Sequence, residues 1–102
     1  MIYKEDIERV REWHEAFWNR ERLKRPLLIV RAYKSNVEPY KERIVDPVTK
    51  WTDIDYIIEE KKRYFESIYF AAEAVPHTIV GIQNGAIAAF LGCDIEFRHE
   101  TD

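Results

Sequence analysis

Hydrophobic residues recur at helical spacing in two parts of the chain and form short continuous runs in others. Residues 4–22 carry one apolar stripe, which predicts a first helix. A second helix is predicted to begin at Thr52, a suitable N-cap residue, and to end before Pro76. Residues 34–51 show little periodicity and contain two prolines, so they are predicted to form a long loop. The stripe of the second helix consists of Ile54, Ile57, Ile58, Phe65, Ile68, Tyr69 and Ala72.

Two apolar runs have the composition of buried strands. The run at 26–33 includes four consecutive apolar residues, which fits a strand covered on both faces, as in a parallel sheet. The second run is 78–82, and the long helix lies between the two. The unit 26–82 is therefore predicted to be a right-handed βαβ crossover with parallel strands. Three shorter elements follow, a turn at 83–85, a helix at 86–91 that Gly92 caps, and a strand at 94–98.

Arg31 is the candidate functional residue of the first predicted strand. A guanidinium is not expected inside an apolar core, so Arg31 should emerge where the strand meets solvent or a ligand. Binding sites of α/β folds form at this carboxyl end of the strands. A planar guanidinium binds a carboxylate through two parallel hydrogen bonds. The alternative is a structural arginine that pairs with an acidic side chain or lies at a solvated strand end.

The composition indicates a single domain over residues 1–102, or part of one. Hydrophobic residues make up 46% and aromatic residues 14%, enough for a core. The net charge of −3 gives no general attraction to nucleic acid or anionic membranes. The single cysteine excludes an internal disulfide and is compatible with a reducing cytosol. No apolar run approaches the roughly 20 residues that span a bilayer, so a cytoplasmic protein is expected.

The remaining reactive residues are expected to be structural. His14 lies on the apolar stripe of the first helix and is expected to be half-buried. His77 precedes the second predicted strand, at the opposite end of the sheet from Arg31. Cys93 follows Gly92 and is expected to be a small buried apolar residue. A basic cluster is expected in solvent at the C-terminal end of the first helix, where the helix dipole favours positive charge. It consists of Arg20, Arg22, Lys24 and Arg25.

Five stretches that span most of the chain carry a family resemblance. They are Trp18-Asn19-Arg20, Arg25–Val30, Trp51–Tyr56, Tyr69–Pro76 and Ala88–Cys93. With these stretches in this order, the chain resembles the N-terminal part of the uroporphyrinogen decarboxylase superfamily, specifically its decarboxylase-like branch. That family is a TIM barrel, a fold of about 250 residues or more. The resemblance implies an α/β fold in which this chain supplies the N-terminal helix and the first βα units of an incomplete barrel, as a fragment.

The resemblance also implies roles for three residues. Arg31 matches the arginine with which the first strand of the decarboxylases binds substrate carboxylates. After the second strand the decarboxylases place an aspartate, whereas this chain has Gln83 and Asn84, which speaks against tetrapyrrole decarboxylation. Gln83 and Asn84 are substrate-binding candidates, with an ordinary turn as the alternative. The zinc and corrinoid of methyltransferase relatives require residues further along, so no cofactor is expected in this segment.

Two functions are compatible with the sequence. The first is an N-terminal segment, inactive alone, of an enzyme that acts on a carboxylated or methylated small molecule. By resemblance this is a lyase that decarboxylates a tetrapyrrole in porphyrin metabolism, or a corrinoid-type methyltransferase. The second is a stand-alone, non-enzymatic α+β interaction module that forms a homo-oligomer through its sheet edge. A truncated product without function is a third, weaker hypothesis.

Overall fold

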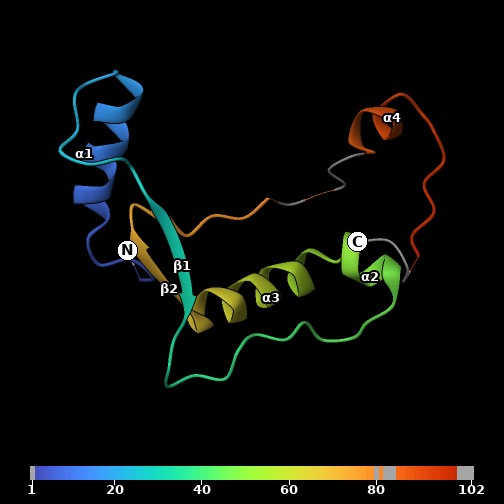
Figure 1. Cartoon of the computed structure of the whole chain (residues 1–102). Coiled ribbons are helices and arrows are strands. Elements are labelled where there is room, and N and C mark those ends of the chain that lie inside the picture. Colours follow the sequence, from blue (N-terminus) through green and yellow to red (C-terminus); the bar gives the residue numbers. More distant parts are fainter. Residues whose placement is uncertain (1, 80, 82–84, 99–102) are drawn as a thin grey trace. The chain divides into compact units, whose positions relative to one another are not determined.

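A computed structural model describes the whole chain except residues 1, 80, 82–84 and 99–102 (Figure 1). The elements of the described part are α1 (Ile7–Trp18), β1 (Ile29–Tyr33), α2 (Pro47–Thr52), α3 (Ile54–Ser67), β2 (Ile68–Ala72) and α4 (Ala86–Phe90). Helices together with a small sheet confirm the expected mixed α/β character. The chain divides into two compact units, Met1–Tyr40 with Arg63–His77, and Lys41–Lys62 with Thr78–Asp102.

The sheet of the first unit consists of β1 and β2, which pair antiparallel from Ile29 opposite Ala72 to Tyr33 opposite Ile68. The prediction of parallel strands joined by a βαβ crossover is therefore wrong. Residues 68–72, which continue the apolar period of the second predicted helix, form a strand instead. Their β-branched and aromatic composition suits a pleated surface better than a helix. Of the predicted strand 78–82, the described residues are not in a strand, and neither are residues 94–98.

The core of the first unit forms around β2. Alternate residues Ile68 and Phe70 are buried, whereas Tyr69 between them is exposed, so β2 presents one face to the core. Phe65, near the end of α3, contacts the Phe70 ring edge-on with ring centroids 5.8 Å apart. The residues that build this core are Ile68, Phe70 and Ala74, with Tyr3, Tyr64 and Phe65 packed against them. Burial on one side of β2 fixes its register, since a one-residue slip would expose Phe70.

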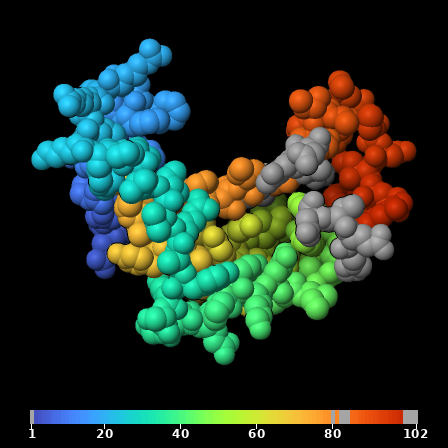
Figure 2. Space-filling view, in the orientation of Figure 1, coloured from blue at the N-terminus to red at the C-terminus, as the bar shows by residue number. Residues whose placement is uncertain are grey.

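Strand β1 is exposed along its whole length, which contradicts the prediction that it is buried on both faces. Ile29 keeps 59% of its surface exposed, against 3% for Phe70 on the paired strand. The space-filling view shows β1, in blue-green, open to the surface (Figure 2). The sheet has two strands, and among the described residues no third strand pairs with β1.

Helix α1 is shorter than the predicted segment 4–22. It ends at Trp18, and Arg20 leaves the helix with a positive φ of 58°. The last turn of α1 contains no basic residue. The predicted pairing of the basic cluster with the helix dipole is therefore wrong, because Arg20, Arg22, Lys24 and Arg25 all follow the helix.

In the second unit, aspartates begin helices α2 and α3. Asp46 accepts a hydrogen bond from the Thr49 backbone N–H at 3.0 Å and caps α2, with Pro47 in the first helical position. Asp53 accepts one from the Tyr56 N–H at 3.1 Å at the start of α3. Thr52, the predicted N-cap, instead donates its hydroxyl to a carbonyl inside α2. The end of the predicted loop is thus helical, because Asp46-Pro47 starts a helix.

The short helix α4 confirms the helix predicted near residues 86–91. Gly92 follows it with a φ of 89°, the left-handed conformation that suits a glycine at a helix end. Cys93 is exposed, which contradicts its predicted burial. None of the helices in the described ranges is long and apolar enough to cross a membrane.

Candidate functional site

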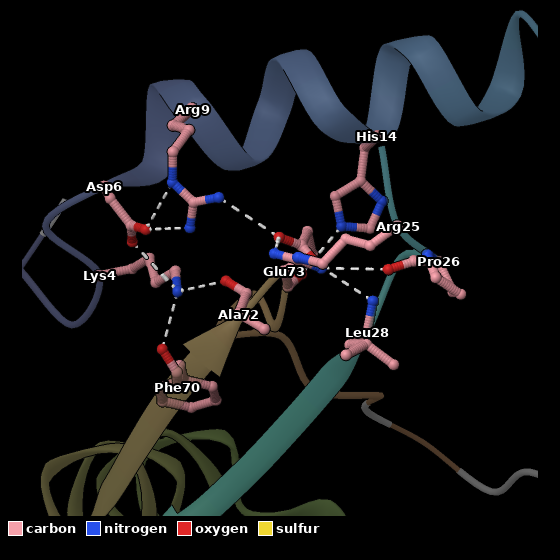
Figure 3. Close-up of polar contacts among 10 residues, drawn as sticks. All are labelled: Lys4, Asp6, Arg9, His14, Arg25, Pro26, Leu28, Phe70, Ala72 and Glu73. Atoms are coloured by element: carbon pink, nitrogen blue, oxygen red, sulfur yellow. Dashed lines mark hydrogen bonds and ion pairs between the residues drawn. The ribbon is translucent and has the colours of Figure 1, made fainter. Parts of the chain in front are cut away.

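The carboxylate of Glu73, directly after β2, is completely buried in the first unit. Figure 3 shows the polar contacts around it. Arg25 binds it through two hydrogen bonds, from Nη1 to Oε2 at 2.8 Å and from Nη2 to Oε1 at 2.7 Å. The Leu28 backbone N–H donates a third hydrogen bond to Oε2 at 3.0 Å. A buried carboxylate thus joins the segment that leads into β1 to the end of β2.

Helix α1 reaches the same glutamate from the other side. Arg9 Nη1 donates to Glu73 Oε1 at 3.3 Å, and the Arg9 guanidinium is also bound by Asp6. His14 Nε2 lies 2.9 Å from the backbone oxygen of Glu73. His14 is half-buried, as the sequence predicts. The Glu73 cluster, defined as Arg9, His14, Arg25, Leu28 and Glu73, therefore joins three segments that are distant in sequence.

The electrostatics of the Glu73 cluster indicate a structural role. Hydrogen bonds from Arg25, and secondarily from the Leu28 N–H and Arg9, lower the pKa of Glu73 to about 2. The carboxylate in turn raises the pKa of Arg25. Glu73 therefore stays ionised at neutral pH, and four donors occupy its oxygens. A carboxylate held in this way orients the chain and is unsuited to exchange protons with a substrate.

Lys4 makes a second buried contact beside this cluster. Its Nζ donates to the carbonyl oxygens of Phe70 at 2.7 Å and Ala72 at 2.8 Å, and forms an ion pair with Asp6 at 3.1 Å. These carbonyls lie on the side of β2 away from β1, because Glu73 donates its N–H to the Leu28 oxygen in the antiparallel ladder. Lys4 thereby blocks part of the outer edge of β2 against a further strand.

Arg31, the candidate from the sequence, lies in the middle of β1 opposite Phe70. Its side chain is exposed, and its Nη2 lies 3.3 Å from Nδ1 of His77. Within the described residues no ion pair of Arg31 with a carboxylate is present. The expectation that His77 lies far from Arg31 is wrong, because the antiparallel pairing returns the chain after β2 to the side of β1.

The other two predicted site residues, Gln83 and Asn84, lie outside the described residues. The structure therefore does not place them relative to Arg31. Among the residues that it does describe, no group of three His, Cys, Asp or Glu side chains is arranged to hold a metal ion.

Sequence reasoning missed the Glu73 cluster, although the sequence contains a signal for it. Glu73 is the single charged residue in the run from Ile68 to Val75. A carboxylate in an apolar run needs a cationic partner if it is buried. The partner of Glu73 is Arg25, which precedes β1, whereas the sequence predicts Arg25 in the basic cluster at the end of the first helix.

No family model, curated protein or solved structure matches this chain.

Proposed function

We propose that this chain is the N-terminal segment of a uroporphyrinogen decarboxylase-like TIM-barrel protein that binds a carboxylated small molecule through Arg31. The observation that carries the proposal is the exposed guanidinium of Arg31, which lies on a strand and contacts His77 but no carboxylate among the described residues. A guanidinium in this state retains N–H groups for a substrate carboxylate. The five sequence stretches that resemble the family support the same assignment.

The exposed apolar surface of β1 supports a larger sheet. Leu28, Ile29 and Val30 are all exposed, although their composition is that of a buried strand. The ladder bonds of Leu28 with Glu73 and of Lys34 with Ser67 direct the backbone groups of residues 29, 31 and 33 away from β2. That edge of β1 is available for pairing with a strand of a TIM barrel, which would also supply covering layers. Because barrel strands are parallel and β2 is antiparallel to β1, only β1 would belong to the barrel sheet in this proposal.

In this proposal the chain contributes to substrate binding and is not catalytic alone. Arg31, Gln83 and Asn84 are the binding residues, and the catalytic groups belong to other parts of the barrel. The reaction is decarboxylation of a carboxylated molecule, a tetrapyrrole by resemblance, or methyl transfer. Zinc or a corrinoid would enter only in a longer methyltransferase-type protein. The proposed enzyme is cytoplasmic and binds neither nucleic acid nor membrane.

The test measures binding of uroporphyrin, a tetrapyrrole with many carboxylates, to the native protein that contains this chain. Arg31→Ala is expected to weaken the affinity at least tenfold, the cost of losing a charged hydrogen bond of about 1.5–3 kcal/mol. Arg31→Lys keeps the charge but loses the bidentate geometry, so it should recover only part of the affinity. Arg22→Ala removes an exposed arginine elsewhere and serves as the control. Equal affinity of the Arg31→Ala and Arg22→Ala variants would rule out the proposed role.

A stand-alone interaction module is the second candidate, and the blocked edge of β2 favours a specific form of it. Because Lys4 occupies the outer carbonyls of Phe70 and Ala72, a second copy would have to pair along β1. The solution mass of the 102-residue chain tests this alternative. A stable dimer that Ile29→Lys dissociates would support the module, and a monomer at micromolar concentration would contradict it.

A further inference from the structure

His77 contacts Arg31, and the proposed binding role of Arg31 does not explain this contact. Its Nδ1 lies 3.3 Å from the guanidinium of Arg31 and 3.0 Å from the backbone oxygen of Val75. The guanidinium is only a donor and the carbonyl is only an acceptor. One ring nitrogen cannot satisfy both, since it must be a bare acceptor for Arg31 and an N–H donor for Val75. A proton on Nδ1 therefore decides which partner His77 keeps: the neutral Nε2–H tautomer can accept from Arg31, whereas the neutral Nδ1–H tautomer and the imidazolium donate to Val75.

We infer that Arg31 and His77 form one oxyanion site in which binding of a carboxylate is coupled to protonation of His77. This inference rests on the proposed binding role of Arg31 and deepens it. In the neutral Nε2–H tautomer, the Nδ1 lone pair accepts from Arg31 and occupies one guanidinium N–H group. When the imidazole is protonated, Nδ1–H donates to Val75 and Nε2–H becomes a second donor. The guanidinium N–H group is then released toward the ligand.

Charge explains why an anion is needed to hold this arrangement. A protonated imidazole beside a guanidinium places two positive charges side by side, which is unfavourable unless an anion lies between them. In the described part of the chain, the charged group in contact with His77 is Arg31 on β1. Glu73, the nearest carboxylate before it in sequence, is occupied by Arg25, Arg9 and the Leu28 N–H. No carboxylate contacts His77 among the described residues, and in this proposal the ligand supplies the compensating charge.

Both side chains are exposed, so a ligand can reach them from solvent. The arrangement suits a molecule with several carboxylates, because one carboxylate can bridge the guanidinium and the imidazolium while the others stay hydrated.

The experiment is calorimetric titration of the native protein that contains this chain with trimesate, a benzene ring that carries three carboxylates. It is carried out at about pH 6 and about pH 8, in two buffers of different ionisation enthalpy, where trimesate stays ionised and histidine titrates. We expect roughly fivefold tighter binding at the lower pH, accompanied by proton uptake. His77→Gln should remove the pH dependence and the proton uptake and keep the affinity measured at the higher pH. Arg31→Ala should weaken binding at both values, and Arg22→Ala should change neither.

The outcomes separate the two claims. If His77→Gln keeps the wild-type pH dependence and proton uptake, the coupling is wrong while the binding role of Arg31 stands. If wild-type protein does not bind trimesate, or if Arg31→Ala binds it equally well, both claims fail. The imidazole proton resonances of His77 provide a direct second measurement in unmodified protein, because they should shift on addition of trimesate. Unshifted resonances at saturation would overturn the inference without relying on a variant.

Discussion

Arg25 and Glu73 form a bidentate ion pair, with both guanidinium–carboxylate distances below 3 Å, across 48 residues of sequence. Glu73 is completely buried, whereas Arg25 keeps 40% of its side chain exposed. The arginine also stacks on Trp13 of α1, with its guanidinium carbon 4.4 Å from the ring centroid. This pair ties α1 and the entry to β1 to the end of β2, and it thereby positions the strand that carries Arg31.

Removal of Arg25 is expected to destabilise the fold. Arg25→Ala leaves the buried Glu73 carboxylate with fewer donors, so the free energy of unfolding should fall by about 2–3 kcal/mol. Arg22→Ala removes an exposed arginine from the same segment and should change stability by less than about 0.5 kcal/mol. Urea denaturation of the two variants measures the difference. Equal losses would show that the ion pair contributes nothing beyond an ordinary surface contact.

Acid should weaken the fold through the same glutamate. Because the pKa of Glu73 is lowered from 4.5 to about 2, its contribution to stability is fully present above about pH 5 and is lost as the pH falls toward 2. Glu73→Gln should flatten this part of the stability–pH curve, measured by urea denaturation at each pH. Glu12→Gln, on the exposed face of α1, is the control and should keep the wild-type slope. A Glu73→Gln curve that parallels wild type would contradict the lowered pKa.

Two glycine substitutions at the end of β2 are expected to change the stability of the fold in opposite directions. Ala72 has a positive φ of 50°, which costs a residue with a Cβ about 1–2 kcal/mol. Ala72→Gly should therefore raise stability by up to about 1 kcal/mol, after the entropy loss of the glycine is subtracted. Ala71→Gly, one residue earlier in ordinary strand conformation, should lower it by about 0.5–1 kcal/mol. Thermal denaturation distinguishes these outcomes, and destabilisation by both variants would contradict the assigned conformation.

Substitution of Ile29 tests whether something covers β1. In the 102-residue chain Ile29 is 59% exposed, so Ile29→Ala should cost less than about 1 kcal/mol, whereas Phe70→Ala should cost about 3–5 kcal/mol. If β1 lies inside a larger barrel in the native protein, Ile29→Ala should there cost about 2–5 kcal/mol. Chemical denaturation of both proteins gives the comparison. A small loss in both would mean that β1 remains uncovered.

Local signals in the sequence predict local elements well. The apolar stripe through Val10 and His14 predicts α1, and Gly92 correctly indicates where α4 ends. Asp46 and Asp53 accept the hydrogen bonds that begin α2 and α3, whereas the sequence predicts Thr52 as the N-cap. Thr52 instead donates its hydroxyl inside α2, which the stripe does not reveal.

Tertiary pairing was not predictable from the same patterns. The apolar period of α3 continues through Ile68, yet the helix ends at Ser67 and the strand pairs antiparallel with β1. The four apolar residues around Ile29 have the composition of a buried strand, but composition does not reveal whether a partner is present to bury them. The contact between Arg31 and His77 depends on that pairing, so the two residues were predicted to lie at opposite ends of the sheet.

The most direct test of the account is the intact mass of the native product that contains this sequence, measured in its source cell. Membership in a decarboxylase-like TIM barrel predicts a product of roughly 30–40 kDa, in which further strands cover β1 and complete the site at Arg31. A product of 12.3 kDa would contradict the barrel assignment, and it would leave the exposed edge of β1 as the surface through which the chain acts.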